Sequence, residues 1–511
     1  MKAPGRDIHV ILGGLSLTIF LYHILTGAFS AYGYFIDEFY YIACSNHLAA
    51  GYVDHPPLSI FLLALSRGLF GDSIPMLRLL PALAGAGTVY MTGLTASRLG
   101  GSRSAVVMAA LGAIAMPVYL LMCSFYSMNA FEPLVWTSIL YFTLRLVQEE
   151  DARYWILIGA LTGIGLEIKH TMALYAAALV AGILLSGSRR LLGNRWCAAG
   201  ALICVLILLP NLIWQYVNGF PSLEFYRNAI VNKNVPRGPA GVIIDQILFA
   251  NPFAFPLWTA GLLYVFASRE GRRYIFLGWG YIILLGVMIA GQSSRPDRIG
   301  AIYTVLFAAG AVAIERAARP PARRLVPVFM MILLTAGMLV VAPVMTPLLP
   351  PPLLRSYLSA LGLSFNLERG KMDEAIPQWL ADRLGWRELA TDVARVYASL
   401  PSDERRQTAI VSTNYGEAGA LELYGPEFGL PRVYATHNSY FTWGPPPDSI
   451  RTYILVYVDL RDAVRRFESV KEAAVHTCGD CTRPQQRIPI YVARGPRFSM
   501  SMEWKNFKIY N

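Results

Sequence analysis

The chain has 511 residues, of which 55% are hydrophobic and only 15% charged, and its mean hydropathy is +0.43. These values exclude an assembly of ordinary soluble domains and indicate a polytopic membrane protein. The net charge of +11 does not indicate nucleic-acid binding, because the lysines and arginines form short clusters between apolar runs, the arrangement that encodes membrane topology.

The N-terminal segment MKAPGRDIHV precedes a long apolar run that has no small-residue cleavage site, which predicts an uncleaved signal anchor. Apolar stretches of roughly membrane-spanning length then recur along the chain. We expect an all-α bundle of about 11 transmembrane helices, formed by residues 8–31, 75–97, 105–122, 131–147, 154–168, 171–186, 196–217, 252–268, 274–291, 299–315 and 325–347.

Basic clusters lie at the N-terminus and between alternate pairs of these stretches, and the positive-inside rule places them in the cytoplasm. They are Lys2 and Arg6; Arg98 and Arg103; Arg145 and Arg153; Arg189, Arg190 and Arg195; Arg269, Arg272 and Arg273; and Arg316, Arg319, Arg323 and Arg324. The unusual polar residues of the membrane half then gather on the opposite, extracytoplasmic face. An odd number of spans places the C-terminus on that face too.

The first outer loop, residues 32–74, holds Asp37 and Glu38, then an aromatic segment from Phe39 to Ala50, then Asp54-His55-Pro56-Pro57. An ionisable group at the bilayer centre costs about 3 kcal/mol or more, so this loop lies at a membrane surface or in a wet cavity. Two interpretations are open for each acidic motif. The first pair caps a helix or serves an active site, and the second motif is a plain turn or part of that site.

Leu58 to Phe70 is too short to span a membrane and contains Arg67, which predicts an interfacial helix beside the acidic loop. Arg78, near the start of the second apolar stretch, is expected to be a snorkelling anchor.

Further charged residues belong to the same face. Lys169 and His170 interrupt an apolar stretch, either as a helix-end lysine that reaches the interface or as a site. Glu132 is either a first-turn helix acid or a site residue, and Glu167 is expected to pair with Lys169 or His170. Arg295-Pro296-Asp297-Arg298 is either an outer loop with an internal ion pair or a cationic site.

After Pro350-Pro351-Pro352 the chain becomes more charged. We expect helices near 373–399, 416–424 and 461–469, and strands at 408–413, 452–457 and 488–493. This predicts a transmembrane domain over 1–349 and a small extracytoplasmic α/β domain over 350–511. In that compartment Cys478 and Cys481 form a local disulfide rather than a zinc site. The other cysteines are interpreted as small apolar residues: Cys44, Cys123, Cys197 and Cys204.

Carboxylates and cations at the outer end of a helical bundle suit two tasks. A transporter uses them as an ion path, but it predicts mid-helix polar residues and a repeated half, which the sequence does not clearly show. Group transfer from a lipid-borne donor uses a carboxylate as base and cations to hold the departing phosphate. A divalent cation held by Asp37, Glu38 and Asp54 is an alternative way to neutralise that phosphate.

The sequence resembles the polyprenyl-phosphate-dependent glycosyltransferases of the GT-C class, the superfamily of the protein O-mannosyltransferases and the lipid A aminoarabinose transferases. The matching motifs keep the order and spacing of that class with respect to the apolar stretches. They are Asp37-Glu38, Asp54 to Leu58, Asn129 to Leu134, Gly163 to His170, Asn414 to Ala420, Tyr424-Gly425-Pro426, His437 to Tyr440 and Trp443-Gly444-Pro445.

The resemblance implies that Asp37, supported by Glu38, is the catalytic carboxylate and that Lys169 meets the lipid phosphate. The lipid A enzymes have a lysine where this chain has His55, and many relatives have an aspartate next to the position of Glu132. Asp54 and Glu132 are supporting candidates. The phosphate-binding candidates are His55, Lys169, His170, Arg295 and Arg298.

We therefore expect an integral glycosyltransferase of the bacterial inner membrane. It would move a sugar, with inversion, from an undecaprenyl-phosphate type of carrier to a lipid, polysaccharide or protein acceptor on the extracytoplasmic face. The alternatives are a transporter or flippase of a lipid-linked or anionic substrate, and a non-catalytic receptor built around the outer domain.

Overall fold

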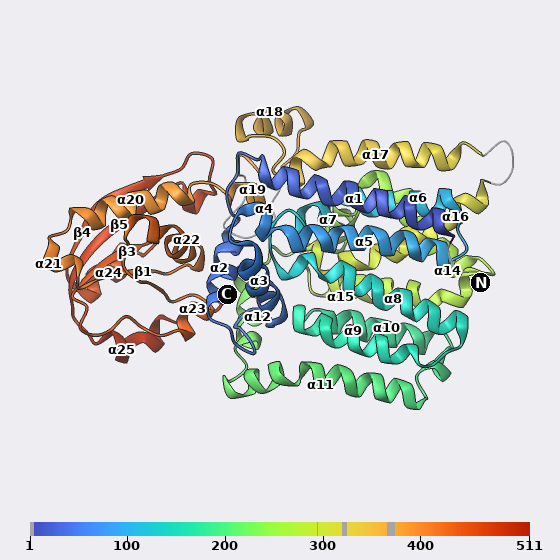
Figure 1. Cartoon of the computed structure of the whole chain (residues 1–511), viewed down its shortest axis with the longest axis horizontal. Helices are drawn as coiled ribbons and strands as arrows, with labels where there is room; N and C mark the ends of the chain where they lie inside the picture. Colours follow the sequence, from blue (N-terminus) through green and yellow to red (C-terminus); the bar gives the residue numbers. More distant parts are fainter. Residues whose placement is uncertain (1–4, 294, 319–323, 365–373) are drawn as a thin grey trace.

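The computed structural model describes residues 5–293, 295–318, 324–364 and 374–511. A long bundle of helices occupies one end of the molecule, and a smaller unit with a five-stranded sheet occupies the other (Figure 1). We call this smaller unit, residues 374–511, the C-terminal unit.

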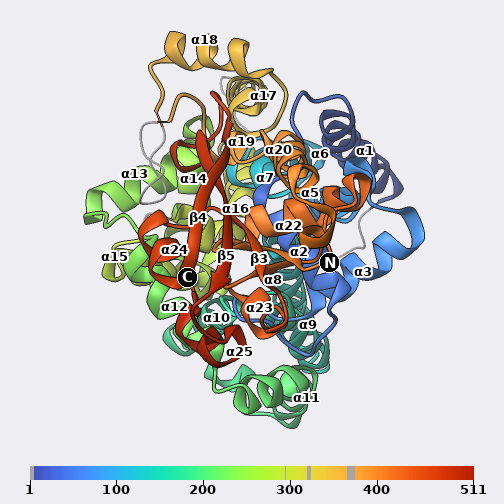
Figure 2. The same ribbon diagram turned by 90° about the vertical axis from the view of Figure 1, so that its left-hand side faces the viewer.

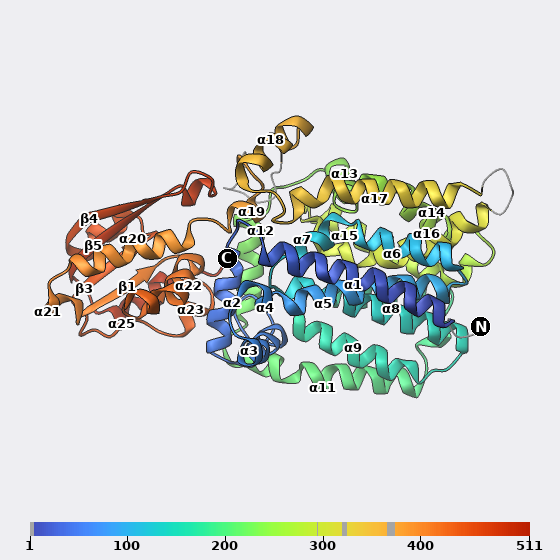
Figure 3. The same ribbon diagram turned by 45° about the horizontal axis from the view of Figure 1, so that its top comes forward.

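A helix forms within each of the apolar stretches. They are α1 (Arg6–Ala28), α5 (Leu79–Arg98), α6 (Arg103–Ile114) with α7 (Pro117–Met122), α8 (Glu132–Glu149), α9 (Tyr154–Ile168), α10 (Met172–Leu185), α11 (Arg195–Val217), α14 (Phe255–Ala267), α15 (Ile275–Ala290), α16 (Tyr303–Ala317) and α17 (Val326–Met345). Many of them run along the long axis of the bundle (Figures 1 and 3).

Within the described ranges, 6 helical segments are long and apolar enough to cross a membrane, or up to 7 if α13 (Pro239–Phe249) and the helix after it form one bent span. The chain is therefore a multi-pass membrane protein, but the expected count of about 11 spans is not confirmed. The helices α9 and α10 have only 15 and 14 residues. At 1.5 Å per residue they are shorter than the hydrocarbon core of about 30 Å.

Four helices lie at the end of the bundle that faces the sheet: α2 (Ile36–Asn46), α3 (Leu58–Phe70), α4 (Ile74–Leu77) and α12 (Pro221–Asn232) (Figures 1 and 3). The bounds of α3 are those expected from the sequence. Its side chains Phe61, Leu65 and Leu69 are exposed, which suits an interfacial helix.

The five strands have the order β2-β1-β3-β5-β4. Figure 2 shows β3, β5 and β4 side by side in this order. The strands β1 (Thr408–Ser412), β2 (Val433–Ala435) and β3 (Thr452–Val456) are parallel, whereas β5 (Arg487–Pro496) runs antiparallel to both β3 and β4 (Phe467–Thr477). The expected strands at 408–413, 452–457 and 488–493 are confirmed.

Two expectations for this unit need correction. The helix expected at 461–469 ends early, because α24 (Leu460–Arg466) is followed directly by the edge strand β4. The helix expected at 373–399 is divided into α19 (Gln378–Ala381) and α20 (Trp386–Ser399), with Gly385 in the left-handed region at φ 77° between them; residue 373 lies outside the described residues.

The remaining helices are α18 (Pro351–Leu361), which stands beside the sheet-side end of α17 (Figure 3), α21 (Ser402–Arg405), α22 (Tyr415–Tyr424), α23 (Ser439–Thr442) and α25 (Met500–Glu503). The expected disulfide is present: Cys478 and Cys481 are bonded, with their Cα atoms 5.5 Å apart. The division of the chain at 349/350 stays a prediction.

Candidate active site

Asp37 lies in the first turn of α2, at the junction of the bundle and the C-terminal unit (Figure 1). Its carboxylate is partly exposed and accepts a hydrogen bond of 2.8 Å from the hydroxyl of Tyr415. Tyr415 is the first residue of α22, so a side chain from the C-terminal unit reaches the acidic loop.

Glu38 is fully buried, and both of its oxygen atoms are occupied. Arg78 donates from Nε and Nη2 at 2.9 and 2.7 Å, and the backbone N–H groups of Phe35 and Tyr126 donate at 2.8 and 2.7 Å. Glu38 therefore caps α2 and also joins it to α5 and to the second outer loop. Arg78 is only 1% exposed, so the expectation that it snorkels to the interface was wrong: it neutralises a buried carboxylate instead.

Asp54 and His55 form the second acidic motif. Asp54 accepts a hydrogen bond of 2.7 Å from the hydroxyl of Tyr40. His55 is fully buried, its ring stacks on Tyr41 at 4.8 Å, and its Nε2 lies 3.9 Å from the Asp54 carboxylate. This Nε2 makes no hydrogen bond within the described part of the chain. It is therefore a polar atom available to a ligand.

Lys169 directly follows α9 and is 5% exposed, so it does not reach out to the interface. Its Nζ lies 2.7 Å from Oε2 of Glu132, which is 1% exposed, and Thr171 donates to the other Glu132 oxygen at 3.1 Å. The expected pairing of Glu167 with Lys169 or His170 was wrong. Among the described residues Glu167 makes no ion pair, and its Oε1 has no hydrogen-bond partner.

His170 connects this lysine to the acidic loop. Its Nε2 lies 3.2 Å from Oδ1 of Asn211 on α11, and Asn211 donates from Nδ2 to the backbone oxygen of Ala50 at 3.0 Å. Its Nδ1 lies 3.1 Å from the hydroxyl of Tyr226 on α12. Burial lowers the pKa of His170; the Asn211 hydrogen bond opposes this, and the charge of His55 adds to it. The imidazole is therefore a neutral link near pH 7.

The Arg295 to Arg298 segment adds further positive charge. Arg295 Nε pairs with Asp297 at 2.9 Å, whereas Arg298 donates from Nη1 to Ser293 Oγ at 3.2 Å and makes no ion pair within the described residues. Asp297 interacts electrostatically with both arginines and with Lys169. These three cations face two carboxylates, those of Asp297 and Glu132, which leaves the cluster with one net positive charge.

A metal site is not assembled from these side chains. In the ranges that the structure describes, no group of three His, Cys, Asp or Glu residues is placed to hold a metal ion. Glu38, one of the three carboxylates considered for a divalent cation, is occupied by Arg78.

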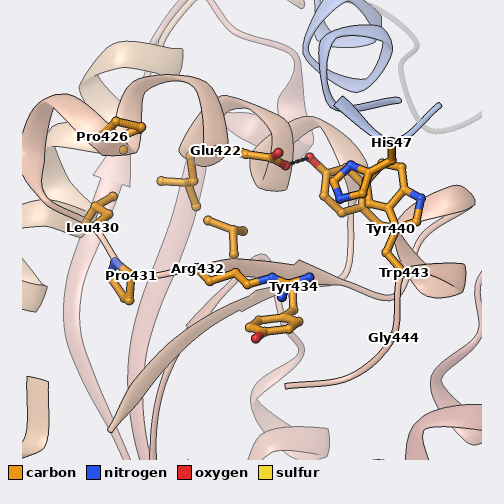
Figure 4. A pocket seen from close by; sticks show the side chains of 13 residues that line it. His47, Glu422, Pro426, Leu430, Pro431, Arg432, Tyr434, Tyr440, Trp443 and Gly444 are labelled. Carbon is orange, nitrogen blue, oxygen red and sulfur yellow. Dashed lines mark hydrogen bonds between the residues drawn. The ribbon is translucent and has the colours of Figure 1, made fainter. Parts of the chain in front are cut away.

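A cavity of about 220 Å³ opens at the other end of α2, between His47 and the C-terminal unit (Figure 4). His47 stacks on Trp443 at 4.1 Å, and the Tyr440 hydroxyl donates to Glu422 at 2.7 Å. Arg432 lies opposite these groups (Figure 4). No residue that the sequence singled out as a site residue lines this cavity. Five of its lining residues belong to the motifs that carry the resemblance to the GT-C class: Gly425, Pro426, Tyr440, Trp443 and Gly444.

The sequence-predicted residues therefore gather at one end of the bundle. Asp37, Asp54 and His55 lie in the loop that covers this end, and Lys169, with its neighbour His170, is tied to that loop through Asn211. The sequence does not predict the contacts that Arg78 and Tyr415 make with the carboxylates: it assigns Arg78 to the interface, and Tyr415 lies in the Asn414 to Ala420 motif without a role of its own. Their partners are far away in the chain, so no local motif shows these contacts.

Comparisons with known proteins bear on the fold. A family model described as dolichyl-phosphate-mannose-protein mannosyltransferase matches residues 54–214, which include Asp54, Glu132 and Lys169. No curated protein matches the chain.

Three solved structures share the fold. ArnT from Cupriavidus metallidurans bound to undecaprenyl phosphate has a TM-score of 0.60 at 16% identity, over 96% of this chain and 98% of that one. Its apo state has a TM-score of 0.60 at 16% identity, over 94% and 97%. Arabinofuranosyltransferase AftD from Mycobacteria has a TM-score of 0.53 at 13% identity, over 98% of this chain and 40% of that one. The resemblance to the GT-C glycosyltransferases is thus confirmed at the level of the fold.

Proposed function

We propose that this protein transfers a sugar from a polyprenyl-phosphate carrier to an acceptor hydroxyl. The reaction would take place at the extracytoplasmic face of a bacterial inner membrane. One observation carries the proposal: the outer-loop carboxylates and the Lys169 cluster lie at the same end of the bundle, linked through Ala50, Asn211 and His170. A sugar phosphate placed there would meet a base on one side and positive charge on the other.

Asp37 acts as the general base. Its carboxylate is partly exposed, whereas the neighbouring Glu38 is saturated by four donors and serves to position the start of α2. Asp37 removes the proton from the acceptor hydroxyl. The acceptor oxygen attacks the anomeric carbon of the donor sugar from the face opposite the phosphate, so the bond to the phosphate oxygen breaks with inversion.

Positive charge stabilises the departing polyprenyl phosphate. Arg298 offers a guanidinium that forms no ion pair with a described carboxylate, and both Arg298 and Lys169 interact electrostatically with Asp297. His55 supplies an unbonded Nε2, and Arg295 adds charge through its pair with Asp297. Charge-assisted hydrogen bonds from such groups to a phosphate are about twice as strong as neutral ones. ArnT, which shares the fold, binds undecaprenyl phosphate, and this supports the choice of donor.

The experiment incubates the purified protein with a panel of polyprenyl-phosphate sugars and with glycolipid, polysaccharide and peptide acceptors, with and without a chelator. A new glycosidic bond and release of the polyprenyl phosphate are expected. Asp462→Asn, which changes an exposed aspartate of α24, is the control and should transfer at the wild-type rate. Loss of activity with chelator would assign a divalent cation to the site. Label that crosses sealed vesicles without a new bond would show a transporter and overturn the proposal.

A further inference from the structure

The hydrogen bond between Tyr415 and Asp37 connects two parts of the chain that lie 378 positions apart. We propose that Tyr415 is a positioning residue for the general base, so that the C-terminal unit completes the catalytic site. This inference rests on the proposed function, because it assigns Tyr415 a role only if Asp37 takes the acceptor proton.

The Tyr415 ring packs against two other rings. The ring lies 4.9 Å from that of Tyr40 and 4.7 Å from that of His437, and the backbone N–H of Tyr415 donates to His437 Nδ1 at 3.4 Å. Asn414 caps α22 by accepting a hydrogen bond from Gly416 N–H at 2.9 Å. The hydroxyl therefore points at Asp37 from a fixed ring at the start of a capped helix.

The C-terminal unit is also seated closely on α2. A Cβ at Gly416 would lie 2.4 Å from Ile36, and a Cβ at Gly419 would lie 2.7 Å from Phe39. Helices α22 and α2 therefore lie so close together that a residue larger than glycine would clash at either position. The backbone N–H of Ile36 donates to the carbonyl oxygen of Asp382 at 3.1 Å. These contacts fix the distance between the two helices that carry Asp37 and Tyr415.

The C-terminal unit also contributes the hydroxyl of Ser439, which is linked to Asp54 through Tyr40. Ser439 Oγ lies 2.8 Å from the Tyr40 hydroxyl, and that hydroxyl lies 2.7 Å from Asp54. The Tyr40 hydroxyl proton is directed at Asp54 and at Ser439 Oγ, and the Tyr40 oxygen accepts a hydrogen bond of 3.1 Å from the backbone N–H of Ser439. Asn438, which precedes Ser439, has φ 47°, so a strained backbone holds the serine in place. Asp37 and Asp54 thus both depend on contacts from the C-terminal unit.

A hydroxyl that donates to an ionised carboxylate favours the charged form and orients its free lone pairs. The titratable and charged groups around Asp37 come from several elements. Tyr41 of α2 and Tyr415 of the C-terminal unit interact with Asp37 directly. Asp54 and His55 interact with Tyr41, and His437 contacts Tyr415. The adjacent Glu38 is neutralised by Arg78. Loss of the Tyr415 hydroxyl should therefore make the Asp37 carboxylate easier to protonate. It should also orient this carboxylate less well toward the acceptor hydroxyl.

The test compares Tyr415→Phe with the wild type in the full-length protein. We expect kcat to fall about 10-fold or more, KM for the lipid donor to stay unchanged, and the acidic limb of the pH–rate profile to move up by about 1 pH unit. Tyr154→Phe is the matched control. It removes a hydroxyl–carboxylate bond of 2.6 Å to Glu149 at the start of α9, and it should change neither kcat nor the acidic limb of the pH–rate profile. The inference would be overturned if Tyr415→Phe had the kcat of the wild type and the same acidic limb of the pH–rate profile.

Two further variants separate the possible failures. Asp37→Asn with full activity would overturn the proposed function itself, whereas an inactive Asp37→Asn beside an unaffected Tyr415→Phe would overturn only the role of Tyr415. Ser439→Ala tests the second contact without changing an aromatic ring, and we expect it to lower kcat by several-fold with the fold retained. A Ser439→Ala rate equal to wild type would contradict the part assigned to the serine.

Discussion

Lys169 and Glu132 form a buried ion pair, 2.7 Å apart, at the point where we expect the donor phosphate to bind. One contact therefore contributes both to folding and to binding. Removal of one partner of a buried pair typically costs about 3–5 kcal/mol, because the other charge is left without compensation. Replacement of both partners by neutral residues of similar shape avoids most of that cost.

We predict that Lys169→Met lowers the free energy of unfolding and that Lys169→Met/Glu132→Gln restores most of it. The donor KM should stay raised by about 10- to 100-fold in the double variant, because the charge-assisted hydrogen bond to the phosphate is still missing. Thermal unfolding in detergent and donor saturation curves check the two parts. A double variant that recovers wild-type donor KM would show that the lysine is purely structural.

His437 gives the C-terminal unit a pH dependence. Burial lowers its pKa from 6.5 to about 3, and the charge of Lys233 adds to the effect. The unfolded chain therefore takes up a proton near pH 6.5 that the folded chain refuses until about pH 3. The contribution of this neutral imidazole to stability is complete above pH 6.5 and falls as the pH drops, by up to about 1.4 kcal/mol per pH unit.

We predict that His437→Gln flattens the loss of thermal stability between pH 6.5 and pH 5. The measurement is the unfolding temperature as a function of pH. His9→Gln, which replaces an exposed histidine at the opposite end of the bundle, should leave the wild-type slope unchanged. If His437→Gln keeps the wild-type slope, the acid sensitivity arises elsewhere.

At the scale of elements, α9 and α11 pack so closely that their glycines touch. A Cβ at Gly159 would lie 2.1 Å from the backbone oxygen of Gly200, and a Cβ at Gly163 would lie 2.9 Å from Ile207. Small residues allow this approach between membrane helices. The contact matters for the site, because α9 leads into Lys169 and α11 carries Asn211.

We predict that Gly159→Ala destabilises the protein by about 1–3 kcal/mol through overpacking and raises the donor KM by moving His170, and with it the neighbouring Lys169, away from Asn211. Gly13→Ala in α1, where no atom lies within 4 Å of the added Cβ, should be neutral or slightly stabilising. The unfolding temperatures of the two variants test the predicted change in stability, and their donor saturation curves test the predicted change in donor KM. Equal behaviour of both glycine variants would contradict the close packing of α9 and α11.

The elements with a strong local pattern could be predicted from the sequence. Helix α3 has the bounds that its apolar run and flanking residues indicated, and the central strands β1 and β3 appear where buried β-branched residues cluster. The strand β2 has three residues, too few to form a pattern, and β4 continues directly from α24 with charged residues on an exposed edge. Pairing with β5, a distant segment, decides the conformation of β4.

The candidate site follows the same rule: its residues could be predicted from the local sequence, but their contacts with distant segments could not. Asp37, Asp54 and Lys169 could be singled out because ionisable residues next to apolar runs are costly. Their partners could not be predicted: Arg78 for Glu38, Glu132 for Lys169 and Tyr415 for Asp37 are all set by packing between segments far apart in the chain.

At the scale of the whole molecule, helix α2, which carries Asp37, lies at the end of the bundle that meets the C-terminal unit, and the N-terminus lies at the other end (Figure 1). We predict that the end that meets the C-terminal unit is extracytoplasmic, as the positions of the basic clusters suggest. The reporters are single cysteines placed at Asp462 in α24 and at Arg190 between α10 and α11, in a variant whose four free cysteines, Cys44, Cys123, Cys197 and Cys204, are replaced by serine.

A membrane-impermeant maleimide added to intact spheroplasts should label the cysteine at position 462 and leave the one at position 190 unlabelled until the membrane is broken. The reverse pattern would place the C-terminal unit in the cytoplasm and contradict the proposed location of the reaction.

The division of roles between Asp37 and the cations is tested most directly by a single-turnover measurement with Asp37→Asn. Donor binding and sugar transfer are followed separately in the same preparation. We expect the variant to bind the polyprenyl-phosphate sugar with the wild-type Kd, because Lys169 and Arg298 are intact. Transfer should be slower by about 10²- to 10⁴-fold, because the acceptor proton has no base. Transfer at the wild-type rate would contradict the assignment of Asp37 as the base and, with it, the mechanism proposed for this fold.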